Sequence, residues 1–156
     1  MTRLYKQIVI AIDSSKEALY AFQTALGIAS RNVGSTLHIV HVIDSAVLSP
    51  LNSGLERMTI EHTQQEAEEL VGRFVRQAED YGIPFIQTAI EIASPKNFIA
   101  KEYAQEVDAD LIICGATGKS GFQRMFVGSV SESIVRAATC DVLVIRTPEH
   151  LWETEQ

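Results

Sequence analysis

Glycines gather in one short stretch of the chain that also carries a lysine and a serine. Gly115, Gly118 and Gly121 are spaced three apart, and Lys119 and Ser120 follow the second of them. Glycines placed after a strand allow the backbone to turn sharply and to bring its N–H groups close to phosphate oxygens. The stretch therefore predicts a loop that binds an anion.

Two familiar phosphate motifs do not fit this spacing. A P-loop requires a glycine five residues before Gly118, and that position is occupied by Ile113. A dinucleotide fingerprint has the pattern G-x-G-x-x-G after the first strand, but the first apolar run ends at Asp13 with no glycine. Neither motif is present.

A second segment that could bind an anion begins ten residues after Gly118. The segment Gly128-Ser129-Val130-Ser131-Glu132 predicts the start of a helix with hydroxyl side chains suited to capping. The free N–H groups and positive dipole end of such a helix favour phosphate. A glycine-rich turn followed by an ordinary capped helix would give the same pattern, and spacing alone does not separate the two interpretations.

These segments must be positioned by a regular framework of strands and helices. Five apolar runs predict strands, at Ile8–Ile12, Leu37–Ile43, Phe85–Ile92, Leu111–Cys114 and Val142–Ile145. Helical periodicities separate them, so the 156 residues predict a single α/β domain with an open parallel sheet and helices on both faces. Ligands bind beyond the carboxyl ends of the strands in such folds, where Asp13 and the glycine loop should lie.

Several short signals predict where the helices begin and end. Ser14 and Glu17 have the spacing of a capping box, which predicts that the first helix begins there. Gly34 and Gly82 stand where two helices should end, and Pro95 suits the first turn of another.

Composition narrows the partners and the compartment. A net charge of −7 argues against nucleic acid and against an anionic membrane surface. No apolar run approaches the roughly 20 residues that cross a bilayer, and the first residues lack a signal-peptide cleavage site. Cys114 and Cys140 form no C-x-x-C pair, so we expect two buried thiols in a reducing, cytoplasmic compartment.

Catalytic machinery is not evident in the sequence. His38 and His41 are three residues apart on a strand, so they face opposite sides and cannot chelate one metal. No Ser-His-Asp spacing and no metal cluster is present. We therefore expect a binding protein and no dedicated enzyme, although slow hydrolysis of a bound nucleotide stays open.

The spaced motif Gly115-x2-Gly118-x9-Gly128-Ser129 resembles the nucleotide motif of ATP-binding universal stress proteins. The resemblance covers nearly the whole chain. Flanking segments that carry it are Ile8–Ser15, His41–Asp44, Ala109–Gly115, Phe126–Ser131 and Asp141–Ile145.

This resemblance implies a Rossmann-like sheet in the order 3-2-1-4-5, a homodimer, and ATP as ligand, for which we expect Mg2+ on the phosphates. Asp13 and Val42 would hold the adenine and ribose side. The phosphate side would be formed by Gly115, Gly118, Gly128, Ser129 and Val130, with Lys119, Ser120 and Arg124 as further candidates in the loop. Asp13 could instead cap the first helix, Val42 could belong only to the core, and the loop cations could be solvated.

The fifth strand suggests how a homodimer would form. Val142, Leu143, Val144 and Ile145 are apolar on both faces and are expected at a sheet edge, which pairing with a twin would cover. We divide the chain into a domain at 1–147 and a short acidic tail at 148–156. The leading hypothesis is an ATP-binding regulatory protein that acts on an unknown protein partner. The alternatives are a dimeric interaction module with structural nucleotide and a very slow ATPase.

Overall fold

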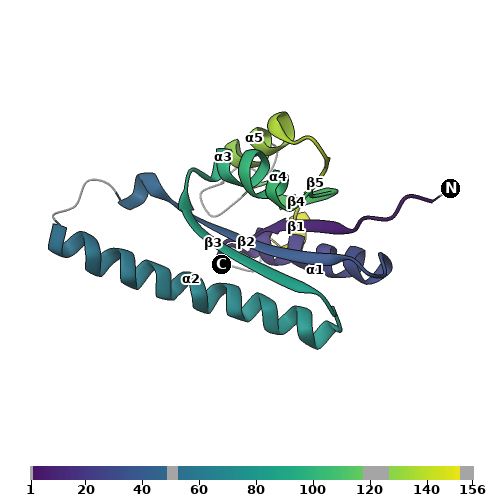
Figure 1. Cartoon of the computed structure of the whole chain (residues 1–156), viewed down its shortest axis with the longest axis horizontal. Coiled ribbons are helices and arrows are strands. Elements are labelled where there is room, and N and C mark those ends of the chain that lie inside the picture. Colours follow the sequence, from purple (N-terminus) through teal and green to yellow (C-terminus); the bar gives the residue numbers. More distant parts are fainter. Residues whose placement is uncertain (1, 49–52, 118–126, 152–156) are drawn as a thin grey trace.

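The computed structural model describes residues 2–48, 53–117 and 127–151, and these form one α/β domain (Figure 1). The strands are β1 Gln7–Ala11, β2 Thr36–Asp44, β3 Ile86–Ala93, β4 Leu111–Gly115 and β5 Asp141–Ile145. The α-helices are α1 Lys16–Arg31, α2 Ser53–Tyr81, α3 Pro95–Asn97, α4 Ala104–Glu106 and α5 Ser129–Ala137. Two 3-10 turns, η1 Ser45–Leu48 and η3 Glu149–Leu151, and a π-helical turn, η2 Phe98–Tyr103, complete the described elements.

All five strands are parallel and lie in the order β3-β2-β1-β4-β5, which confirms the predicted sheet. Each predicted strand is present, with ends that differ from the prediction by one residue at most. The apolar runs of the three central strands, β1, β2 and β4, are buried on both faces, as is typical of a parallel sheet, whereas the edge strands β3 and β5 are partly exposed.

Helices cover both faces of the sheet. On one face α1 and α2 pack together, and the rings of Phe22 and Phe74 meet edge to face with centroids 4.7 Å apart. On the other face α3, η2, α4 and α5 cover a second core that contains Val9, Val40 and Ile112 (Figure 1). No helix among the described residues is long and apolar enough to span a bilayer.

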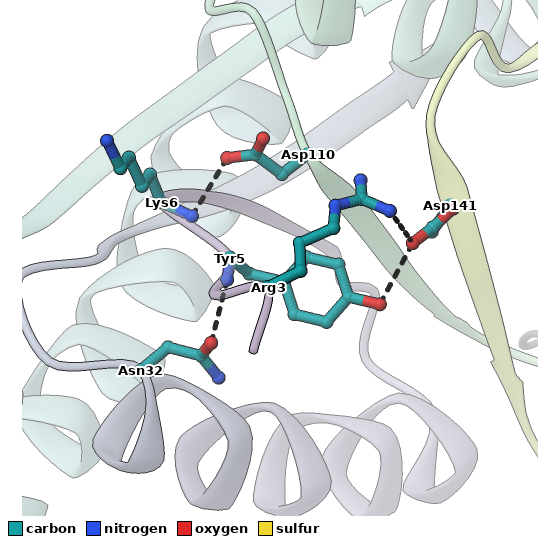
Figure 2. A network of polar contacts seen from close by, with 6 residues as sticks. All are labelled: Arg3, Tyr5, Lys6, Asn32, Asp110 and Asp141. Carbon is teal, nitrogen blue, oxygen red and sulfur yellow. Dashed lines mark hydrogen bonds and ion pairs between the residues drawn. The ribbon is translucent and has the colours of Figure 1, made fainter. Parts of the chain in front are cut away.

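The amino ends of the strands are held by a polar network that Figure 2 shows. The carboxylate of Asp110 accepts hydrogen bonds from the first two N–H groups leading into β1, at 2.8 and 2.7 Å. The carboxylate of Asp141, at the start of β5, accepts from Arg3 at 3.1 Å and from the hydroxyl of Tyr5 at 3.0 Å. Donation to this carboxylate raises the pKa of Tyr5. The network fastens the N-terminal segment at the opposite end of the sheet from the predicted ligand site.

Candidate functional site

A cavity of about 570 Å³ opens at the carboxyl ends of β1, β2 and β4. Its size falls within the range of small-molecule pockets, and its place is where open α/β sheets bind ligands. It brings together six of the predicted site residues, which come from four separate segments: Asp13, Val42, Gly115, Gly128, Ser129 and Val130. Gly118, Lys119, Ser120 and Arg124 lie outside the described residues.

Asp13 enters the cavity from the turn between β1 and α1. Its Oδ1 accepts a hydrogen bond from the backbone N–H of Ser15 at 2.8 Å and another from the Ser15 hydroxyl. Ser15 is the N-cap of α1, and its side-chain oxygen accepts from the N–H of Ala18 at 3.1 Å. The prediction that Ser14 caps this helix is therefore wrong by one residue, because the Asp13 carboxylate holds Ser15 in the capping position. Asp13 itself is not the cap.

The turn that carries Asp13 is held against β2. The N–H of Ile12 donates to the carbonyl of Val40 at 2.9 Å, and Nδ1 of His41 lies 2.9 Å from the carbonyl of Ile12. Because a carbonyl only accepts, the His41 Nδ1 carries the proton of this bond. His41 thus positions the end of β1, and it faces away from the buried His38, as the spacing predicts.

The end of β2 supplies a second wall of the cavity. Val42 is half-buried and packs against the core beneath α5 while it also lines the cavity, so a place in the core does not exclude contact with a ligand. Asp44, two residues on, lines the cavity as well, and its Oδ1 accepts from the N–H of Ala46 at 3.0 Å. The sequence prediction did not include Asp44, although its position at a strand end was a signal that could have found it.

The third wall joins the end of β4 to the start of α5. The N–H of Gly128 donates to the carbonyl of Ala116 at 2.5 Å, and the hydroxyl of Ser131 lies 2.9 Å from the same carbonyl. Gly128 is the N-cap of α5 and supplies no side-chain cap, so the predicted capping hydroxyls are not used in that way. Ser131 instead ties the helix to the loop after β4, and the N-terminus of α5 faces the cavity through Ser129.

The glycines at 115 and 128 are required by close approach. A Cβ atom on Gly115 would lie 3.1 Å from the carbonyl oxygen of Thr117, and one on Gly128 would lie 3.2 Å from the carbonyl oxygen of Ala116. Neither glycine has a positive φ, which among the described glycines belongs to Gly34 and Gly82. Gly128 therefore lies backbone to backbone against the loop after β4, and without a Cβ at either glycine the backbone N–H groups can approach a ligand closely.

The remaining wall was missed by the sequence prediction. Pro95 and Ile99, from the helical segment after β3, line the cavity. Its floor includes Cys114, whose thiol pKa burial raises to about 12, so this thiol stays protonated. Cys114 is buried as predicted, whereas Cys140 is only half-buried. Among the residues that the structure describes, no group of three or more His, Cys, Asp or Glu side chains could hold a metal ion.

The fold and this cavity define a single α/β domain that can hold a small ligand at the carboxyl edge of a parallel sheet. The sequence matches the Universal stress protein family over residues 4–146. A Staphylococcus aureus protein named as a universal stress protein is 46% identical over 145 residues, which cover 93% of this chain and 86% of the relative. The chain belongs to the Universal stress protein family.

Solved structures agree with this assignment. The universal stress protein UspA from Lactobacillus plantarum has a TM-score of 0.82 and 28% identity, covering 93% of this chain and 100% of the other. A universal stress protein from Archaeoglobus fulgidus in complex with dAMP has a TM-score of 0.66 and 22% identity, covering 92% of this chain and 99% of the other. The second likeness shows the fold alone.

Proposed function

We propose that this protein binds an adenine nucleotide, ATP with Mg2+ on its phosphates, in the cavity at the carboxyl ends of β1, β2 and β4. The observation that carries the proposal is the convergence of Asp13, Val42, Gly115 and Gly128 on one cavity of about 570 Å³. Occupancy would report nucleotide status to a regulatory partner in the cytoplasm.

The chemistry of the α5 end supports a phosphate there. The first N–H groups of a helix have no partner within the helix, and the dipole gives this end a partial positive charge. Gly128 and Gly115 leave no Cβ between the backbone and a ligand. A likeness at the level of fold adds the ligand class, because the structure from Archaeoglobus fulgidus holds dAMP and another universal stress protein, at 22% identity, holds cAMP.

We place this protein among binders and not among dedicated enzymes. The carboxylates that line the cavity, Asp13 and Asp44, already accept hydrogen bonds from the neighbouring backbone. A general base must itself lie within hydrogen-bond reach of the proton that it removes from the substrate. Very slow ATP hydrolysis is the alternative, and it would be favoured by a turnover that a variant defective in binding does not share.

The first test is direct. Protein purified without added nucleotide is denatured, and the supernatant is analysed for released nucleotide, while a second sample is melted with and without millimolar Mg-ATP. At an ATP concentration of about 100 times the dissociation constant, binding adds roughly 2.7 kcal/mol to the free energy of unfolding. If no nucleotide were released and Mg-ATP did not shift the melting temperature, the proposal would be wrong.

A charge substitution tests the placement of the phosphates. Ser129 is exposed and occupies the first turn of α5, so Ser129→Asp places a carboxylate where it stabilises the helix but repels phosphate. We expect unchanged or slightly higher stability without ligand and an ATP dissociation constant at least tenfold higher. Ser133→Asp adds the same charge one turn further along α5, away from the cavity lining, and should bind ATP nearly as well as the wild type.

A second proposal concerns assembly. β5 is an edge strand whose residues from Val142 to Ile145 are half-buried, and an open apolar edge favours pairing with a second copy. We propose a homodimer through β5. Val144→Lys should lower the mass measured by light scattering to that of a monomer, whereas Val135→Lys, on the exposed face of α5, should not. A Val144→Lys protein that keeps the dimer mass would exclude this interface.

A further inference from the structure

Three polar side chains, two buried and one half-buried, form a series of hydrogen bonds near the amino ends of β1 and β2. The hydroxyl of Tyr103 lies 3.0 Å from Nδ1 of His38, and Nε2 of His38 lies 2.7 Å from Oε1 of Gln7. His38 is 2% exposed and Tyr103 is 9% exposed. These hydrogen bonds link three elements, because Tyr103 ends η2 while His38 and Gln7 lie on β2 and β1.

The direction of these hydrogen bonds follows from the acceptor at one end. Oε1 of Gln7 only accepts, so the proton of the imidazole is on Nε2. Nδ1 is then the acceptor, and the Tyr103 hydroxyl donates to it. Burial lowers the pKa of His38, which keeps the ring neutral and this arrangement intact. Both ring nitrogens are satisfied, so the position of Tyr103 is defined by a specific partner as well as by packing.

Tyr103 closes an unusual helical turn. η2 is π-helical over Phe98–Tyr103, and the N–H of Ala104 donates to the carbonyl of Ile99, five residues earlier. A π turn is an α-helix widened by one residue, and such turns occur frequently at functional sites. The widened turn lets three successive residues, Phe98 to Ala100, be buried together.

The same turn, together with α3 just before it, forms a wall of the cavity. Ile99 and Pro95 line it, and both precede the π turn's closing residue, Tyr103. Reversion to an α-helix would remove one residue from the turn, which rotates everything before it by about 100° and shifts it by about 1.5 Å relative to Tyr103. The side chain of Ile99 would then no longer face the cavity as it does here.

We propose that Tyr103 is a positioning residue for the ligand site. Its hydrogen bond to His38 holds η2 in the π form, and the π form places Ile99 and Pro95 against the bound nucleotide. This inference rests on the proposed function, because it assigns a determinant of affinity for the same ligand. The hydrogen bonds among Tyr103, His38 and Gln7 would thus act on the binding site indirectly, because none of these three residues lines the cavity.

The test compares variants of the full-length protein by ATP titration. Tyr103→Phe removes the donor and keeps the ring. We expect ATP binding to weaken about three- to tenfold, the change that the loss of one buried hydrogen bond gives when it acts on the bound form. Gln7→Leu, at the other end of the Tyr103–His38–Gln7 series, should also weaken ATP binding. The double variant should lose less ATP affinity than the product of the two single effects.

Two controls separate positioning from general destabilisation. Tyr81→Phe removes an exposed hydroxyl at the end of α2 and should change neither the ATP dissociation constant nor the melting temperature. Phe74→Leu loosens the core between α1 and α2, on the other face of the sheet, and should lower the melting temperature without changing the ATP dissociation constant.

A spectroscopic measurement follows the hydrogen bond itself. In the wild type the nitrogen spectrum of His38 should show a neutral ring protonated at Nε2, and Tyr103→Phe should shift the Nδ1 resonance while amide exchange quickens over 99–104. Unchanged ATP affinity in Tyr103→Phe, with wild-type protein that binds ATP, would overturn this inference alone. Wild-type protein that does not bind ATP would overturn the proposed function and this inference with it.

Discussion

Replacement of Gly128 by alanine tests whether the loop after β4 and the start of α5 must touch through bare backbone. The backbone of Gly128 has φ −68° and ψ 163°, which any residue adopts, so alanine introduces no conformational strain. Its Cβ, however, would lie 3.2 Å from the carbonyl oxygen of Ala116 and 3.5 Å from Cα of Thr117. Both neighbours are backbone atoms and cannot swing aside.

The magnitude follows from the movement that this contact forces. The loop has to shift by a few tenths of an ångström, which lengthens the hydrogen bond from the Gly128 N–H to Ala116. Overpacking of this kind costs about 1–3 kcal/mol, and each kcal/mol lowers the melting temperature of a chain of this size by about 2–4 °C. We expect ATP affinity to fall as well, because the two phosphate-side segments move apart.

Urea unfolding and ATP titration measure the two effects, and Gly72→Ala is the matched control. Gly72 lies inside α2, where an added Cβ meets only the flexible end of Arg76 at 3.5 Å. Alanine is the better helix former there and should raise the free energy of unfolding by up to about 1 kcal/mol. If Gly128→Ala were as stable as the wild type and bound ATP equally well, the close-approach argument would be refuted.

Three further predictions concern single groups. Ser15→Ala should lower the free energy of unfolding by about 1 kcal/mol in urea titrations, because it removes the cap of α1 and a donor to Asp13. Burial lowers the pKa of His38, so the unfolded chain binds the proton first, and stability should fall as pH drops below about 6.5 towards the folded pKa. The urea midpoint should fall less between pH 7.5 and pH 5.5 in His38→Gln than in the wild type. Thiol-reactive reagent at pH 8 should modify the half-buried Cys140 before Cys114, whose pKa of about 12 leaves almost no thiolate in the folded protein.

The strands could be predicted because their signal is local and strong. Runs such as Leu111 to Cys114 are short and apolar without alternation, which is the pattern of a strand buried on both faces of a sheet. The place of the cavity then followed from the rule that parallel sheets bind ligands beyond their carboxyl ends. Asp13 and Gly115 were predictable in this way.

The capping of two helices could not be predicted, because it depends on contacts between segments. Two adjacent serines follow Asp13, and only the bond from Ser15 to the Asp13 carboxylate selects the second as the cap. At α5 the neighbouring loop places the carbonyl of Ala116 against Gly128, and this uses the hydroxyl of Ser131 for a tertiary bond.

The wall formed by Pro95 and Ile99 was missed for a different reason. A π turn interrupts the 3.6-residue period over Phe98–Tyr103, so the apolar pattern of this segment does not tell which residues share a face. The turn depends on His38 and Gln7, which are far away in sequence. Long-range hydrogen bonds of this kind leave no mark in a local pattern.

The distribution of charge along the cavity would favour one direction for the proposed nucleotide. Asp44 and Asp13 stand at the ends of the adjacent strands β2 and β1, and carboxylates accept hydrogen bonds from hydroxyl and amino groups but repel phosphate. The N-terminus of α5, tied to the loop after β4, offers N–H groups and a positive dipole end. Because β4 lies on the other side of β1 from β2, the two kinds of group are separated across the edge of the sheet. The proposed nucleotide would satisfy both kinds of group with its ribose and base towards β2 and its phosphates towards α5.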